Sequence, residues 1–345
     1  MLWTDVIDPA TLTGYARAAL ADYEERKGTL ARWLPNRDVA DVVVRFMAGQ
    51  TGLIDVARFR AYDAEPEVGK RQPKRRVTIE LPALGETRPV TEYEQLRARG
   101  GSVTDEAALV AIQNETLTAV RAVSDAIERL RGIVLSTGKA TIDQDNFKSD
   151  DDFGRPGAHD VTAGTLWSAA GADPLTDLQT WSDVYENSTG ETPGSILMPR
   201  RVFRAMSNNA AFKTTLIGGA ERAATESQVR DLVSAAGLPT ITIYDRRVSV
   251  AGSAARVTPD NKMFLLPEEV GTDDWQGTDL GATFWGRTLT STDPEWSIEE
   301  SEQPGVVVGV YRNPKPPMGV EVVSDGIALP VLANAERSFA ATVLS

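Results

Sequence analysis

The chain of 345 residues contains no cysteine and a single histidine, His159. Without cysteine there is no disulfide framework, no thiolate nucleophile and no thiolate metal site. A Ser-His-Asp triad would have to be built around His159, and no G-x-S-x-G motif accompanies it. We therefore expect His159 to lie in a turn or at the surface, and we predict no catalytic residues.

Nucleotide-binding motifs and long apolar runs are also absent. The sequence has no G-x-x-x-x-G-K-S/T motif and no G-x-G-x-x-G motif after a strand, so no segment is a candidate for binding phosphates. No stretch approaches the roughly 18 consecutive apolar residues of a membrane-spanning helix. The N-terminus lacks the basic-then-apolar order of a signal peptide. We predict no cofactor, no membrane association and synthesis in the cytoplasm.

The chain has fewer positively charged residues than negatively charged ones. Lys and Arg number 36 against 49 Asp and Glu, which gives a net charge of −13. Such a balance repels a polyphosphate surface, so broad nucleic-acid binding is disfavoured. It suits a wall that encloses DNA without adhering to it, although most acidic proteins have this balance merely for solubility.

One acidic run, at residues 143–152, could be a calcium loop because hard cations bind several oxygen ligands from one short segment. The EF-hand pattern fails, however. Its sixth position is Lys148 rather than glycine, and its twelfth, Gly154, supplies no carboxylate. We interpret residues 143–157 as a solvated, loop-rich acidic region and predict no metal site.

Residues 104–136 have the clearest helical pattern. Apolar residues recur at spacings of three and four until Gly138 ends the run. A long helix with one apolar stripe must lie across a sheet or against a neighbouring subunit. The stripe consists of Ile112, Leu117, Val120, Val123, Ile127, Leu130 and Val134.

The remaining segments indicate a mixed α+β chain. An alternation of strands and helices follows the long helix and predicts a compact lobe. The last fifty residues are β-like, with predicted strands at 306–311, 320–323 and 327–332. Their natural partner is the long helix.

Between residues 53 and 101, proline and glycine separate segments of alternating polarity, which predicts a long two-stranded excursion. Its tip is basic in an otherwise acidic chain. The tip has three interpretations: a contact with an acidic neighbouring subunit, a solvated hairpin end, or a nucleic-acid patch. We favour the subunit contact because a projecting hairpin buries little of itself and leaves long unpaired edges. The candidate interface residues are Lys70, Arg71, Lys74, Arg75 and Arg76.

This order of segments resembles the Hong Kong 97-like (HK97-like) capsid fold of tailed bacteriophages. In particular it is similar to the lambda major head protein family, also called capsid protein E. The residues that carry the likeness are 73–82, 135–142 with 152–155, 167–181, and 304–311. The resemblance implies an N-terminal arm (1–52), an extended hairpin loop (53–101), a peripheral domain whose first part (102–157) holds the spine helix (104–136), an axial domain (158–293), and returning peripheral strands (294–345).

The resemblance also implies a function. Members assemble into hexamers and pentamers that form an icosahedral shell around a double-stranded DNA genome. Scaffolding protein and portal protein are the implied partners, together with a decoration protein at three-fold positions. The implied locations are the bacterial cytoplasm during assembly and the virion capsid afterwards.

Two alternatives remain open at the level of sequence. An encapsulin-like nanocompartment shares the fold but encloses cargo enzymes instead of a genome. A soluble enzyme that uses scattered carboxylates and His159 is the other, and the sequence offers no assembled motif for it.

Overall fold

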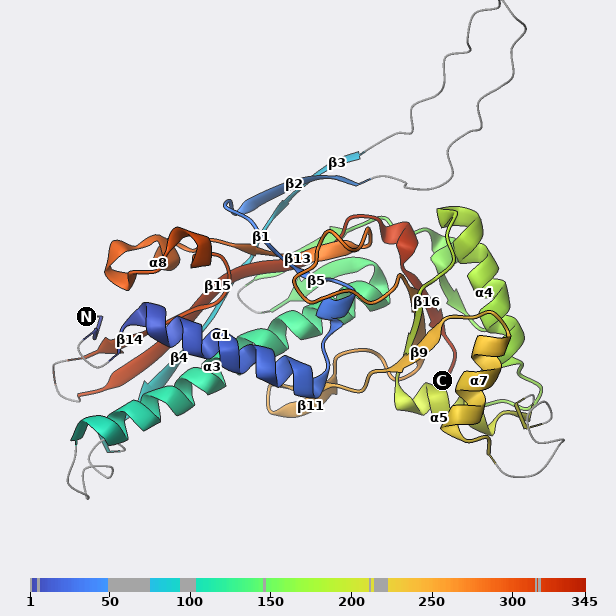
Figure 1. Ribbon diagram of the computed structural model, residues 1–345, viewed down its shortest axis with the longest axis horizontal. Coiled ribbons are helices and arrows are strands. Elements are labelled where there is room, and N and C mark those ends of the chain that lie inside the picture. Colours follow the sequence, from blue (N-terminus) through green and yellow to red (C-terminus); the bar gives the residue numbers. More distant parts are fainter. Residues whose placement is uncertain are drawn as a thin grey trace, which may run out of the picture.

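The computed structural model describes residues 2–4, 7–48, 75–93, 104–144, 147–210, 212–213, 223–313, 315 and 318–345. At residues 47–48, 75–76 and 104–108 only the backbone is described. Figure 1 shows an elongated molecule with the N-terminus near one end and the C-terminus in the lobe at the other. Among the helices of these ranges, none is both long and apolar enough to cross a membrane.

The first sheet is built around one long strand, β15 (Val320–Leu332). Its first half lies between two strands, and its second half pairs with a third, which in turn pairs with a short parallel strand. The sequence predicted two strands here, at 320–323 and 327–332, and that prediction was wrong because the ladder continues without a break through Gly326. The partners are β4 (Ala83–Val90), β14 (Val307–Arg312), β13 (Gly281–Gly286) and β1 (Asn36–Asp38).

The long helix α3 (Thr104–Thr137) packs on this sheet, which confirms the predicted helix and its predicted partner. Its stripe residues Val120 and Val123 share one apolar cluster with Val308 and Val322 of the sheet. Helix α1 (Pro9–Lys27) joins the same cluster through Leu12 and runs alongside α3 (Figure 1). The apolar stripe is thus buried largely within the subunit itself.

Helix α3 ends for a local reason. Gly138 adopts a positive φ of 73°, which glycine reaches without steric cost, and its N–H bonds to the carbonyl of Val134 at 2.8 Å. The chain then turns into β5 (Lys139–Asp143), which pairs with β6 (Lys148–Asp152). The acidic region predicted as loop-rich is therefore in large part a β-hairpin. The sequence prediction failed here because β6 consists only of polar residues.

The second lobe contains a five-stranded sheet in the order β7-β16-β12-β8-β9. Strand β12 is buried on both faces. Met263 and Leu265 contact the lobe's helices, while Phe264 and Leu266 join the cluster at the end of α3. The strands are β7 (Asp160–Thr162), β8 (Ser195–Met198), β9 (Thr240–Ile243), β12 (Lys262–Leu266) and β16 (Phe339–Thr342). The helices are α4 (Pro174–Thr189), α5 (Arg200–Asn208) and α7 (Glu226–Ala235).

The two sheets exchange strands across the expected segment boundaries. Strand β13 lies at 281–286, within the predicted axial segment, but pairs in the first sheet. Strand β16 lies in the returning C-terminal segment but pairs in the second. Four further strands form two-stranded pairs: β2 (Val43–Ala48) with β3 (Arg75–Glu80), and β10 (Arg247–Val250) with β11 (Ser253–Arg256). The other elements are the short helix α8 (Leu289–Thr292) and the 3-10 turns η1 (Leu30–Arg32), η2 (Gly157–His159), η3 (Pro294–Trp296), η4 (Glu300–Glu302) and η5 (Ala335–Arg337).

Candidate subunit interface

A two-stranded ribbon, β2 with β3, lies at the edge of the body (Figure 1). Its base is anchored by apolar side chains, because Val44 and Ile79 are buried and belong to the central cluster. Phe46 stacks on Phe284 of the first sheet at a centroid distance of 6.3 Å. The ribbon is therefore a firmly attached element rather than an independent hairpin.

The ribbon places two of the five predicted interface residues. Arg75 pairs with Ala48 and Arg76 with Met47, at the end of the ribbon away from its junction with β4. Lys70, Arg71 and Lys74 lie outside the described residues. The role of all five in a subunit contact stays a prediction.

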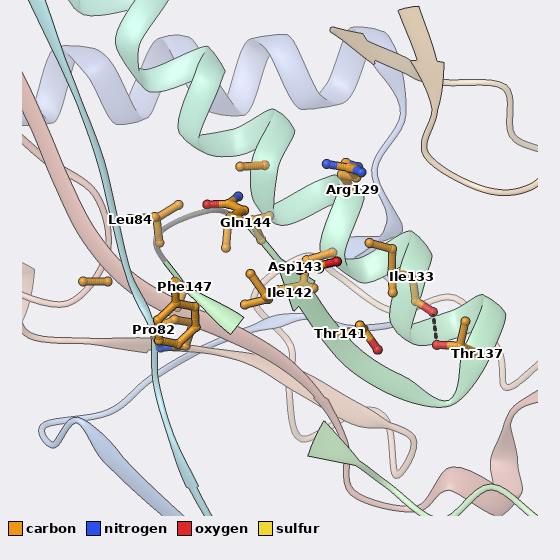
Figure 2. A pocket seen from close by; sticks show the side chains of 15 residues that line it. Pro82, Leu84, Arg129, Ile133, Thr137, Thr141, Ile142, Asp143, Gln144 and Phe147 are labelled. Carbon is orange, nitrogen blue, oxygen red and sulfur yellow. Dashed lines mark hydrogen bonds between the residues drawn. The ribbon is translucent and has the colours of Figure 1, made fainter. Parts of the chain in front are cut away.

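A groove of about 490 Å³ opens between α3, the β5–β6 hairpin and the start of β4 (Figure 2). Leu130 and Ile133 reach it from the helix, and Ile142 from the hairpin. Phe147 lines it as well and keeps 46% of its surface exposed. Polar groups stand around these apolar residues: Arg129, Thr137, Thr141, Asp143 and Gln144.

The β5–β6 hairpin beside the groove carries an excess of carboxylates. Asp143 pairs with Lys148 and Asp152 with Lys139, each at 2.8 Å. Asp150 accepts a hydrogen bond from Thr141 at 2.7 Å. Within the described ranges no three histidine, cysteine or acidic residues come together as a metal site. These carboxylates therefore have partners within the hairpin, and the surface of the hairpin still carries a net negative charge.

A buried carboxylate in the C-terminal third of α3 joins three distant segments. Glu128 is fully buried and forms a 3.0 Å ion pair with Arg131. It accepts hydrogen bonds from the Leu30 N–H at 2.7 Å, from the Thr29 hydroxyl at 3.1 Å and from the Tyr244 hydroxyl. Burial, reinforced by the charge of Glu128, raises the pKa of Tyr244 above its usual range. The phenol therefore stays protonated and donates to the carboxylate.

A second guanidinium completes this network. Arg246 is buried, forms a 2.8 Å ion pair with Asp125 and donates to the carbonyl of Gly28 at 3.0 Å. Two guanidinium groups thus face two carboxylates where the turn after α1, the helix α3 and the segment after β9 meet. Because Glu128 is closed to solvent, the arrangement fits a structural junction rather than a substrate site.

His159 lies in the turn η2, which is one of the two predicted positions, and its side chain is buried, with 1% exposed. Its Nε2 atom lies 2.9 Å from the hydroxyl of Ser188, and its ring packs against Tyr185 and Phe339. Burial lowers the pKa of His159. The imidazole is thus a core group, and it is held beside a hydroxyl that is itself only partly buried.

Arg155 is a further structural residue that the sequence reading missed. Its guanidinium donates to the carbonyl of Leu135 at 2.6 Å and to Ser338 at 3.0 Å, so it caps the C-terminus of α3 and joins it to the strand β16 region. Burial lowers its pKa to about 10. No sequence signal marks this contact. Glu128 and Arg131 did carry one, because both charges fall beside stripe residues of the predicted helix.

Comparison with known proteins adds to this geometry. A family model described as phage major capsid protein E matches residues 19–277. A prophage protein of E. coli CFT073 assigned as a capsid protein has a similar structure, with TM-score 0.65 and 15% identity, over 98% of this chain and 99% of its own. A phage-related protein of Bordetella bronchiseptica RB50 is similar over 97% of both chains, with TM-score 0.59 and 15% identity. No curated protein matches. The predicted resemblance and the predicted α+β, HK97-like fold are confirmed.

Proposed function

This chain belongs to the phage major capsid protein E family, and on that premise we propose that its copies tile an icosahedral shell as hexamers and pentamers around double-stranded DNA. The match over residues 19–277 is the observation that carries this function. The likeness to a prophage capsid protein over nearly the whole of both chains supports it. The protein is a phage major capsid protein with the HK97-like fold.

The shell holds together, in this proposal, through many weak contacts that each subunit makes several times over. The anchored β2–β3 ribbon supports a role for the extended loop as one such contact, with Lys70, Arg71, Lys74, Arg75 and Arg76 at its basic end. The net charge of −13 supports attraction of this loop to neighbouring subunits. The same charge favours a wall that encloses DNA without sequence-specific binding.

In this proposal the chain divides into an arm (1–52), an extended loop (53–101), a peripheral domain (102–157 and 294–345) and an axial domain (158–293). The partners in it are a scaffolding protein during assembly, a portal protein, and a decoration protein at three-fold positions. Assembly takes place in the host cytoplasm, and the mature location is the virion.

The proposed role is structural rather than enzymatic. The family is one of shell proteins. The burial of His159 supports this role, because an imidazole closed to solvent cannot exchange protons with a substrate.

Negative-stain electron microscopy of the purified protein tests the proposal. We expect closed shells or their hexamer and pentamer building blocks. Shells from infected or induced cells should also absorb at 260 nm as nucleic acid does. A chain that stays monomeric at high concentration would contradict shell formation, and shells filled with protein cargo instead of DNA would favour the nanocompartment alternative.

A further inference from the structure

Arg37 in β1 is a partly buried cation with aromatic neighbours and no acidic partner. Its guanidinium carbon lies 3.9 Å from the ring centre of Trp275 and 5.2 Å from that of Phe284. Among the residues that the structure describes, none forms an ion pair or a hydrogen bond with this guanidinium. Burial lowers the pKa of Arg37, and no carboxylate offsets that effect. The charge and the N–H donors of Arg37 are therefore available to a ligand.

The geometry of β1 keeps Arg37 apart from the next carboxylate along the chain. Successive side chains of a strand point to opposite faces, and Asp38 accordingly lines a cleft beside α1. Arg37 instead lines a separate pocket of about 230 Å³, the Arg37 pocket. Arg45 lines this pocket too, as does Asp41, whose carboxylate accepts the N–H of Val43 at 3.3 Å. The pocket thus holds two cations against one carboxylate that already has a partner.

The stacking determines how Arg37 can bind a ligand. A guanidinium stacked on an aromatic ring keeps its N–H groups along its edge, and their fork matches the two oxygens of a carboxylate. Because Trp275 fixes the orientation before binding, less side-chain entropy is lost when a ligand arrives. We propose that the Arg37 pocket binds the carboxylate of an Asp or Glu side chain from a second copy of the chain. This inference rests on the proposed shell function, which brings copies side by side.

The composition of the chain and of the pocket favours a carboxylate over a phosphate. The chain has 49 acidic residues, so an adjacent copy presents many carboxylates. A DNA phosphate is the competing oxyanion, but the net charge of −13 repels DNA. Val44, Phe46 and Phe284 give the pocket an apolar wall. Such a wall fits the methylene stem of an acidic side chain better than a strongly hydrated phosphate.

The substitution Arg37→Lys allows a direct test, because it places a primary amine where the carboxylate is expected. Variant subunits, half of them labelled with heavy nitrogen, are assembled and treated with a water-soluble carbodiimide. The reagent activates the carboxylate, the amine displaces it to form an amide, and the oxygen that is lost converts the carbodiimide to its urea. We expect an amide between position 37 and an Asp or Glu, with one joined peptide labelled and the other unlabelled.

Arg204→Lys is the matched control, because Arg204 is exposed on α5. It should give at least tenfold less of the mixed product, since nothing holds a carboxylate beside it. The masses of the joined peptides identify the partner residue.

The unmodified protein supplies a second test, which decides the matter if Arg37→Lys does not assemble. Phenylglyoxal modifies accessible guanidinium groups, and mass spectrometry of the peptides locates each modified arginine. We expect Arg37 to react at least tenfold more slowly in shells than in free subunits. The protection should be the same in empty and in DNA-filled shells.

The outcomes separate the inference from the proposed function. Well-formed Arg37→Lys shells that give no amide at position 37, or only amides within one chain, would overturn the inference and leave the shell function standing. Equal rates of Arg37 modification in shells and in free subunits would also overturn it. Protection in DNA-filled shells alone would assign the pocket to DNA phosphate instead. Failure of the unmodified protein to form shells would contradict the proposed function itself.

Discussion

At the scale of single residues, the charges buried in the C-terminal third of α3 are those whose removal should cost the most stability. Glu128 accepts hydrogen bonds from the turn after α1 and from Tyr244, and Arg131 donates to Asn36 at 2.7 Å. Removing one member of a buried ion pair leaves the other charge without compensation, which costs more than the pair itself contributes. This network therefore acts as a joint between segments far apart in the chain.

The substitution Glu128→Gln tests that joint. It leaves Arg131 and Arg246 facing one remaining carboxylate, Asp125, in a closed site. We expect the free energy of unfolding to fall by about 3–5 kcal/mol. Urea denaturation of the isolated subunit measures it. Glu186→Gln, at an exposed position on α4, is the matched control and should change stability by less than about 0.5 kcal/mol. Equal losses of unfolding free energy for Glu128→Gln and Glu186→Gln would show that the buried network does not hold these segments together.

His159 predicts a pH dependence of stability. Because burial lowers its pKa in the folded state, the unfolded chain binds the proton more tightly, with a pKa near 6.5. Stability is therefore complete above pH 6.5 and falls as the pH drops below it. Thermal unfolding between pH 7.5 and 5 should show this loss, and His159→Gln should reduce the slope. Parallel pH profiles for the two proteins would rule out a contribution from His159.

At the scale of elements, a glycine inside α3 marks where another segment crosses the helix. A Cβ added at Gly132 would overlap the carbonyl of Val257, which explains why glycine stands here although alanine is the better helix former. Gly14 in α1 is the opposite case, since no atom lies within 4 Å of an added Cβ.

The two glycines form a matched pair. Gly132→Ala should lower stability by about 2 kcal/mol or more, because the crossing backbone must shift. Gly14→Ala should raise it by about 0.5–1 kcal/mol through helix propensity. Calorimetry of the two single variants measures both. A stabilised Gly132→Ala variant would show that Val257 does not press on the helix.

Elements with strong local signals were predictable from sequence. Helix α3 has a stripe of apolar residues at helical spacing, and α7 begins with a capping box between Thr225 and Gln228, whose residue types stand at that spacing in the sequence. Strands β8, β9 and β12 belong to the alternation of strands and helices that the sequence predicts, because short apolar runs bounded by turn residues mark buried strands.

Elements defined by distant pairing were not predictable. Strand β16 lies between β7 and β12, and nothing in Phe339–Thr342 indicates either partner. Strand β6 is a run of polar residues that becomes a strand only by pairing with β5. The local sequence sets only the propensity of a segment to form a strand. Whether β16 and β6 form depends on the strands with which they pair.

At the scale of the whole molecule, the shared strands tie the two lobes into one unit. Strand β12 contributes one face to the core of the second lobe and the other face to the cluster at the end of α3. The C-terminal strand β16 enters the second sheet after β15 has completed the first. Separation of the lobes would therefore expose the cluster in which Phe264 and Leu266 of β12 lie with Val134 and Leu135 of α3.

Only one part of the candidate interface was predictable from the sequence, because the other part is assembled from distant segments. The basic loop end is continuous in the sequence and was identified from it. The groove is assembled from residues within 82–84, 126–137 and 141–144, together with Phe147 and Ala328, so it exists only after α3 has packed on the first sheet.

Charge reversal at the ribbon separates assembly from folding. The double substitution Arg75→Glu/Arg76→Glu changes two adjacent positions at the outer end of β3, where Arg75 pairs with the last residue of β2. The subunit should keep its circular dichroism spectrum and its melting temperature. Shell yield by electron microscopy should fall at least tenfold, since like charges then meet an acidic neighbour.

A matched control reverses two exposed arginines outside the ribbon, Arg204 of α5 and Arg247 of β10, to glutamate. This changes the net charge of the subunit by the same amount, so it measures how far overall repulsion alone reduces assembly. Assembly should be reduced far less than by the ribbon variant. Equal losses would assign the effect to net charge rather than to the ribbon, and normal shells from the ribbon variant would remove these two arginines from the subunit contact.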